Sequence, residues 1–134
     1  MSTDRPFRST AVSAQLSDRM LDVLLTWVRT ALVQLQTAEP ATGAVMESVR
    51  LLFESARRYP ASPLHMELDI GPGPAGVAIQ IRAVPLARQA EHVNVSTVWQ
   101  GVSLPWRQVR VVVRQREATV VIEEIPAASS RPKW

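Results

Sequence analysis

Apolar residues recur at steps of three and four through residues 13–36, which predicts a long first helix. One apolar stripe follows this spacing: Leu16, Met20, Leu24, Trp27, Val28, Ala31 and Leu35. Leu21, Leu25 and Leu32 widen the apolar sector beyond the ~100° that is typical of a surface helix. We therefore expect this helix to be covered on more than one side.

A second amphipathic helix is predicted for residues 42–58, with Thr42 as its cap. Its apolar face consists of Val45, Met46, Val49, Leu52, Phe53 and Ala56. Pro40 separates the two helices, because the residue before a proline avoids the α conformation. Pro60 ends the second helix for the same reason.

From Leu64 onward the period of the apolar residues changes to two, which indicates strands with one buried and one polar face. The pattern predicts five strands, at residues 64–70, 76–84, 91–99, 107–114 and 118–125. The first two form a hairpin through a loop at 71–76, with Ile70 opposite Val77. The last two form a second hairpin, in which Val109, Val111 and Val113 are expected to point inward. Its turn lacks Asn-Gly and is expected to contain four residues.

The predicted fold is α+β, with two N-terminal helices packed on one face of a five-stranded antiparallel β-meander. Residues 9–126 form the single domain, between a flexible arm at 1–8 and a flexible tail at 127–134. A helix over residues 13–36 would be about 36 Å long. The sheet would be about 24 Å wide with strands of about 23 to 30 Å. We therefore expect the helix to extend past the sheet and to contact a second copy or another protein.

The composition is that of a small globular domain, with 134 residues, 46% hydrophobic residues and a net charge of +3. The chain has no cysteine, which excludes disulfides, thiolate nucleophiles and cysteine-ligated zinc. The first ten residues lack the apolar segment of a secretory signal, and no apolar run reaches the ~20 residues of a membrane span. We expect a cytoplasmic protein.

Four arginines cluster in the second predicted hairpin, next to two tryptophans: Arg107, Arg110, Arg114, Arg116, Trp99 and Trp106. Aromatic rings beside guanidinium groups can bind single-stranded nucleic acid. However, Glu123 is expected to face Arg110 across the hairpin and to neutralise part of this charge. The same residues are also compatible with an ordinary solvated sheet face or with a surface for an acidic protein partner.

No pattern in the sequence indicates a catalytic, cofactor-binding or metal-binding site. His65 and His92 lie on different predicted strands without the spacing of a zinc site. The glycine-rich loop at 71–76 contains Pro72 and Pro74, which lack the amide donors of a phosphate-binding loop. No Gly-x-Ser-x-Gly motif is present, so we predict no catalytic residues, no cofactor and no metal ligands.

These observations favour a non-catalytic protein-interaction or assembly module, a homodimer that forms through the first helix or a sheet edge. The expected partner-binding residues are Leu21, Leu25, Leu32, Trp106, Arg110 and Arg114. One alternative is a cone of helices and sheet that binds a small apolar ligand or acts as an enzyme. A less supported alternative is nucleic-acid binding through the hairpin at residues 107–116.

Overall fold

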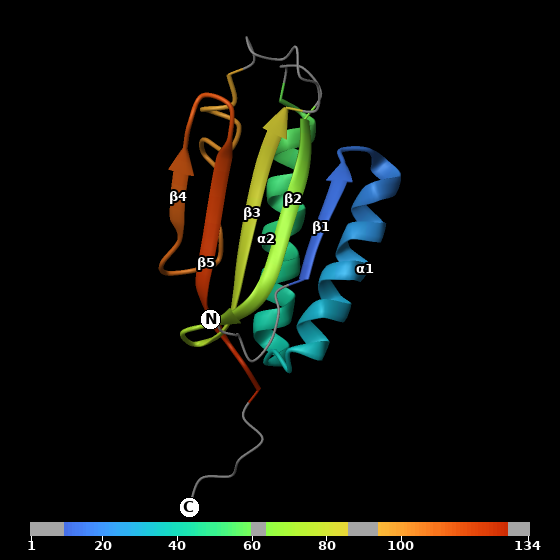
Figure 1. The fold of residues 1–134 in the computed structure, drawn as a ribbon, viewed down its shortest axis with the longest axis vertical. Helices are drawn as coiled ribbons and strands as arrows, with labels where there is room; N and C mark the ends of the chain where they lie inside the picture. The colour runs from blue at the N-terminus through green and yellow to red at the C-terminus, as the bar shows by residue number, and fades with distance from the viewer. Residues whose placement is uncertain (1–9, 60–63, 86–93, 129–134) are drawn as a thin grey trace, which may run out of the picture.

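The computed structural model describes residues 10–59, 64–85 and 94–128. Two helices lie on one face of a five-stranded antiparallel sheet (Figure 1), so the predicted α+β class is confirmed. The elements follow one another as β1 (Thr10–Gln15), α1 (Asp18–Gln34), α2 (Glu39–Arg57), β2 (Leu64–Gly73), β3 (Gly76–Pro85), β4 (Arg110–Val113) and β5 (Ala118–Pro126). In the described part of the chain, neither helix is long and apolar enough to cross a membrane.

The first helix is shorter than predicted, because residues 10–15 form a strand. β1 pairs antiparallel with β2, with Thr10 opposite Ile70 and Val12 opposite Leu68. This pairing at the sheet edge outweighs the helical spacing of the local sequence. The 17 residues of α1 span about 26 Å, whereas the ten residues of β2 span about 33 Å. The helix therefore does not extend past the sheet, and the length mismatch predicted from the sequence was wrong.

The second helix begins earlier than predicted, at Glu39, with Pro40 in its first turn. Proline is suited to this position, since the first amides of a helix have no partner within the helix. Thr42 therefore lies inside α2, where its hydroxyl donates to the carbonyl of Ala38 over 3.2 Å. The predicted start at Thr42 was wrong for this reason.

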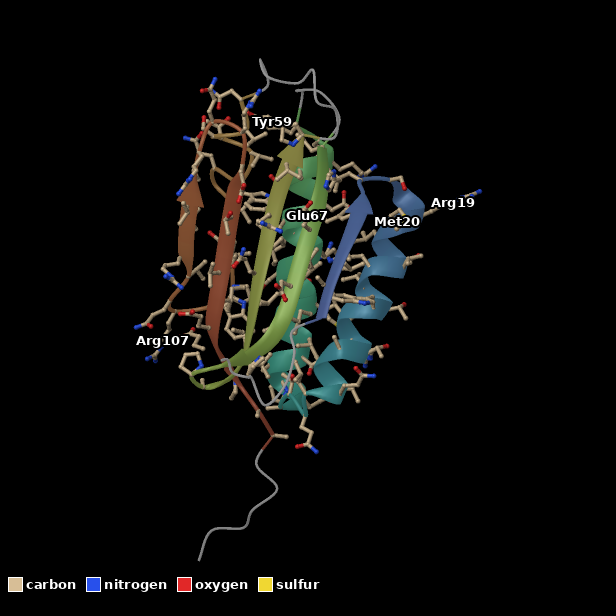
Figure 2. All side chains as sticks on the ribbon, in the orientation of Figure 1. Arg19, Met20, Tyr59, Glu67 and Arg107 are labelled. Atoms are coloured by element: carbon tan, nitrogen blue, oxygen red, sulfur yellow. The ribbon has the colours of Figure 1, made fainter. Side chains whose placement is uncertain are left out.

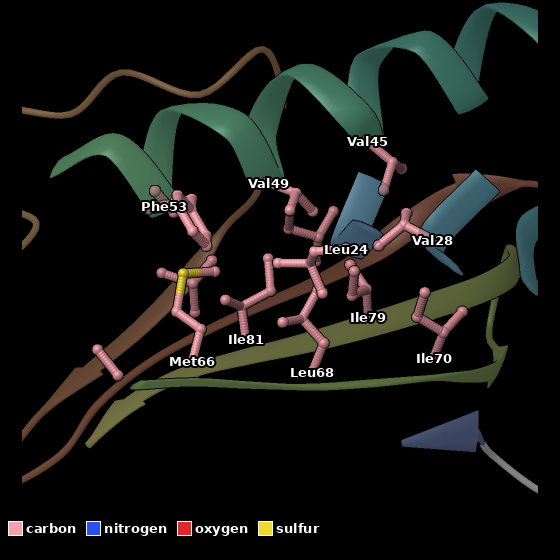
Figure 3. Close-up of a cluster of buried hydrophobic side chains, with 14 of the residues drawn as sticks. Leu24, Val28, Val45, Val49, Phe53, Met66, Leu68, Ile70, Ile79 and Ile81 are labelled. Atoms are coloured by element: carbon pink, nitrogen blue, oxygen red, sulfur yellow. The ribbon is translucent and has the colours of Figure 1, made fainter. Parts of the chain in front are cut away.

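The core lies between the helices and the sheet (Figure 3). Val45, Val49 and Phe53 point from α2 toward the strands and are fully buried. The strands supply a matching apolar face: Met66, Leu68, Ile70, Ile79 and Ile81. The alternation that predicted one buried face for β2 is confirmed by its burial pattern.

The hairpin of β2 and β3 is tighter than predicted, with only Pro74 and Ala75 between the strands. Gly73 pairs with Gly76, and a Cβ atom at Gly73 would lie within 2.9 Å of Val77. Ile70 therefore faces Ile79 rather than Val77. The shift of two residues in register preserves the buried face, because side chains alternate with a period of two.

Residues 94–99 of the strand predicted at 91–99 are irregular, and residues 91–93 lie outside the described residues. Residues 94–106, named here the α2-bound segment, are held along α2 by side-chain hydrogen bonds. Four such bonds are Tyr59 hydroxyl to Asn94 carbonyl (2.6 Å), Ser55 hydroxyl to Val98 carbonyl (2.7 Å), Trp99 Nε1 to Leu52 carbonyl (3.0 Å) and Trp106 Nε1 to Ser48 Oγ (2.8 Å). The fifth strand of the sheet is β1 instead.

The order of the strands across the sheet is β1-β2-β3-β5-β4, so β5 lies between β3 and β4. β4 has four residues instead of the predicted eight, and four residues connect it to β5, as predicted. Thr37 forms an isolated bridge with Ala127, so ordered structure continues beyond residue 126. The predicted arm at 1–8 and most of the predicted tail lie outside the described residues.

Candidate functional site

β4 lies at an edge of the sheet and exposes apolar side chains. Among the described residues it pairs with β5 alone, with Val111 opposite Val120. The exposed fractions of Val111, Val112 and Val113 are 53%, 44% and 43%. Three exposed valines in succession, without a proline or a charge between them, leave this edge open to a further strand.

The backbone of β4 has hydrogen-bonding groups that point away from the sheet. The amide of Arg114 donates to the carbonyl of Glu117 over 2.8 Å, which makes these two residues a hydrogen-bonded pair. Hydrogen-bonded and non-hydrogen-bonded pairs alternate along an antiparallel ladder. Val112 and Arg110 therefore bond toward β5, whereas the N–H and C=O groups of Val111 and Val113 face outward.

An apolar groove of about 270 Å³ lies beside β4, on the side of the sheet that the helices cover. Its walls are mostly apolar and include Leu52, Trp99, Leu104, Trp106, Val109 and Val111, and Arg107 also lines it. Val111 and Val120 reach it from the strands, and Leu52 reaches it from α2. A strand placed next to β4 would therefore direct alternate side chains toward this groove.

Two hydrogen bonds fix the tryptophans that line the groove. Trp99 is buried, and its indole donates to a carbonyl of α2. Trp106 is half-buried, and its indole donates to the hydroxyl of the fully buried Ser48. Because both rings are fixed to a helix, the groove is preorganised rather than formed by a loose loop.

The opposite face of β4 is polar and basic. Arg110 forms an ion pair with Glu123 at 3.0 Å, as the sequence indicated, although the residue directly opposite Arg110 is Val121. Arg114 is exposed, and its guanidinium has no partner among residues 10–59, 64–85 and 94–128. Two hollows line this face, of about 630 and 370 Å³, and Arg110 contributes to both.

Glu124 fixes the start of β4. Its carboxylate accepts the amide of Arg107 over 2.8 Å and the amide of Gln108 over 3.3 Å. Figure 2 shows Arg107 beside the start of the strand. The carboxylate satisfies backbone donors that the short strand leaves unpaired, which holds the edge in an extended conformation.

The structure separates the six predicted partner-binding residues into two groups. Trp106, Arg110 and Arg114 lie around β4, whereas the three leucines lie on α1, which packs beside β1 at the other edge of the sheet (Figure 1). Leu32 is fully buried in its own core, so its predicted contact with a partner was wrong. The remaining two, Leu21 and Leu25, are half-buried against that core.

The three valines of β4 were not predicted from the sequence as surface residues. Val111 and Val113 were expected to point inward, because a period of two places them on the apolar face of the strand predicted at 107–114. The run Arg-Val-Val-Val-Arg at residues 110–114 contains a signal of exposure, because apolar side chains on both faces of a strand between two charges do not follow the alternation of a half-buried strand.

Within the described residues, no group of three or more histidine or acidic side chains is arranged to hold a metal ion. His65 Nε2 lies 3.1 Å from Glu67, which also pairs with Arg82 at 2.7 Å. Figure 2 shows Glu67 on the face of the sheet that is turned away from α2. His92 lies outside the described residues, so the predicted separation of the two histidines is not tested.

No protein-family model matches this chain, and no curated protein sequence matches it. A function is therefore inferred below from the geometry of the β4 edge.

Proposed function

We propose that this chain is a non-catalytic protein-interaction module that binds an extended segment of a partner protein as an additional strand beside β4. The observation that carries the proposal is the outward orientation of the backbone groups of Val111 and Val113 next to a preformed apolar groove. Main-chain hydrogen bonds at a sheet edge supply affinity in this mode of recognition, and pockets for alternate side chains supply specificity.

β4 is short and begins with an arginine, which are two protections of an edge strand, but other protections are missing and their lack supports this proposal. Exposed edges commonly carry a proline, a bulge or an inward-pointing charge that prevents pairing with another chain. β4 has no proline and no charged residue between Arg110 and Arg114, and its three valines have a high β propensity. Each outward backbone group that gains a partner contributes about 0.5 to 1.5 kcal/mol.

The test removes one outward amide without removing a bond to β5. In the variant Val113→Pro, the lost N–H is one that faces away from the sheet, a position where proline is tolerated. The matched control Val113→Ala keeps this amide and loses only the side chain. Both variants and the natural chain are used to select binders from displayed random peptides of about ten residues, a length that exceeds an average strand.

We expect the natural chain and Val113→Ala to enrich related peptides and Val113→Pro to enrich none. Circular dichroism and thermal unfolding show whether each variant keeps its fold. If folded Val113→Pro selects the same peptides as the natural chain, backbone pairing at β4 is not the mode of binding. If the natural chain itself enriches no peptide, the interaction proposal is rejected.

Homodimerisation is the second candidate, and exposed apolar residues of α1 favour it. Val23 and Val33 have exposed fractions of 56% and 64%. A dimer through this face would be abolished by the double change Val23→Glu and Val33→Glu, since the charges would have to be buried between the subunits. Light scattering of the natural chain and of the double variant, over a range of concentrations, measures the oligomeric state of each. A natural chain that remains monomeric at high concentration excludes the dimer.

Binding of a small apolar ligand and binding of nucleic acid have less support from the geometry. The groove of about 270 Å³ is smaller than the ~300 to 1,000 Å³ of typical ligand sites. Nucleic-acid binding by the hairpin is opposed by the ion pair of Arg110 with Glu123, and by Glu117 and Glu124 nearby. Retention of the chain on immobilised single-stranded DNA at physiological salt would reverse this ranking.

A further inference from the structure

We infer that the strand accepted by β4 carries acidic side chains on one face and apolar side chains on the other, in the pattern acidic, apolar, any residue, apolar, acidic. This inference rests on the proposed strand addition and names the chemistry of the partner. It follows from the different surroundings of the two faces of β4.

The helix-covered side of β4 selects the apolar positions. Alternate side chains of a strand lie on opposite faces of the sheet, and paired residues of neighbouring strands share a face. Val111 lines the apolar groove together with Leu52 and Trp106. Val113 shares this face, since it is two residues further along β4. A partner residue beside Val111 therefore enters the groove, and one beside Val113 lies on the same face against the exposed side chain of that valine.

The open side of β4 selects the acidic positions. Arg110, Val112 and Arg114 line one hollow of about 370 Å³ on this face, together with Glu117, whose carboxylate accepts the hydroxyl of Thr119 over 3.1 Å. Arg114 has no partner for its guanidinium in the described part of the chain, and Arg110 uses Nη2 for Glu123 while the other donors of its guanidinium remain. A carboxylate placed beside either guanidinium can accept two parallel hydrogen bonds.

The five positions opposite residues 110–114 define the pattern. Acidic residues lie beside the two arginines, apolar residues beside Val111 and Val113, and the central residue beside Val112. This pattern reads the same in both directions along the chain. It therefore holds for a parallel and for an antiparallel partner strand, which differ in hydrogen-bond pattern but not in the alternation of faces.

A second copy of β4 has the opposite charge to this pattern. Its own residues read Arg-Val-Val-Val-Arg, with arginine at both positions where the surface favours an acid. In the fully overlapping antiparallel register, Arg110 of one copy would lie opposite Arg114 of the other. Like charges directly opposite each other destabilise a strand pair. The charge therefore favours an acidic partner segment over self-pairing at this edge.

The test compares three capped synthetic peptides that share one apolar pattern. Their core sequences are Glu-Val-Thr-Val-Glu, Gln-Val-Thr-Val-Gln and Lys-Val-Thr-Val-Lys, flanked by glycines. Affinity for the natural chain is measured by calorimetry at low and at high salt. Each acidic residue should raise the affinity about two- to fivefold. The Glu peptide should therefore bind about tenfold more tightly than the Gln peptide. This difference should decrease at high salt.

The variant Arg114→Glu assigns the preference to β4, and Arg19→Glu is its control, since Arg19 is exposed on α1, away from β4 (Figure 2). Arg114→Glu should lose the preference for the Glu peptide and gain affinity for the Lys peptide, whereas Arg19→Glu should behave as the natural chain. Equal affinity of the Glu and Gln peptides overturns the inference and leaves strand addition intact. If none of the three peptides binds, both the acidic pattern and the proposed strand addition are rejected.

Discussion

The hydrogen bond from Trp106 to Ser48 should measurably stabilise the fold, because it fixes the α2-bound segment to α2. The bond length is 2.8 Å, and Ser48 is fully buried. The test is a double-mutant cycle with Trp106→Phe, Ser48→Ala and the combined variant. Phenylalanine keeps most of the apolar ring and removes the indole donor, and alanine removes the acceptor.

The expected coupling energy is that of one partly buried hydrogen bond, about 0.5 to 1.5 kcal/mol. Each single variant loses the shared bond, and Ser48→Ala also loses the bond from Ser48 Oγ to the carbonyl of Ala44 (2.8 Å). The combined variant should lose the shared bond only once. At about 2.1 cal/mol/K per residue, unfolding 134 residues has an entropy of about 0.28 kcal/mol/K. A loss of about 1 kcal/mol therefore lowers the melting temperature by about 3 to 4 °C.

Unfolding is followed by far-ultraviolet circular dichroism in urea and on heating, since the substitutions alter tryptophan fluorescence. Trp27 supplies the control, because it lies half-buried on α1, which packs beside β1 at the edge of the sheet opposite β4 (Figure 1). The losses of stability caused by Trp27→Phe and by Ser48→Ala should add, without a coupling energy. If the losses of Trp106→Phe and Ser48→Ala also add within about 0.3 kcal/mol, the two side chains do not interact in solution.

Three further predictions test the fold. Leu32→Ala should destabilise the protein by about 2 to 5 kcal/mol in urea unfolding, because this side chain is buried. Val33→Ala, one residue along α1 and exposed, should change stability by less than about 0.5 kcal/mol. Similar losses of stability in the two variants would contradict the orientation of α1. Gly76→Ala should lower the melting temperature strongly, because Gly76 has a φ of 136° and a new Cβ would lie 2.6 Å from the amide nitrogen of Ala127; an unchanged melting temperature would show that the hairpin adopts another turn. Glu124→Gln should weaken the two bonds to the start of β4 and speed hydrogen exchange of those amides; unchanged exchange would mean that this carboxylate does not hold the strand.

The fold class could be predicted from the sequence because the buried face of each long element follows one period. β2 alternates as its sequence indicates, and the apolar face of α2 is buried. The predicted β2–β3 register was wrong by two residues, but the residues assigned to each face of the sheet were still correct. What failed was pairing, since no local pattern specifies that residues 10–15 join β2.

The α2-bound segment was misread for a different physical reason. Val93, Val95 and Trp99 alternate like a strand, but Val95 and Trp99 are buried against α2 and neighbouring residues in irregular backbone. The signal that could identify this arrangement lies on α2 and two residues past its end. Ser48, Leu52, Ser55 and Tyr59 are spaced by four, three and four residues, so they form one stripe that receives the segment.

The candidate site was only partly predictable. Trp106, Arg110 and Arg114 were identified by their residue types, and they do lie around one strand. The exposure of Val111 and Val113 depends on where β4 lies in the sheet, which the order of the chain does not reveal. The choice of Leu32 failed because the helix is rotated so that this side chain faces the core.

The placement of β5 between β3 and β4 determines how synthesis of the chain completes the sheet. β4 leaves the ribosome before β5, but it has no position in the sheet until β5 has joined β3. Until then β3 presents a long bare edge, which is a hazard for misassembly in a nascent chain. A chain truncated before residue 118 would therefore have an unfinished sheet with β3 at its edge, and the open edge at β4 can exist only on a completed fold.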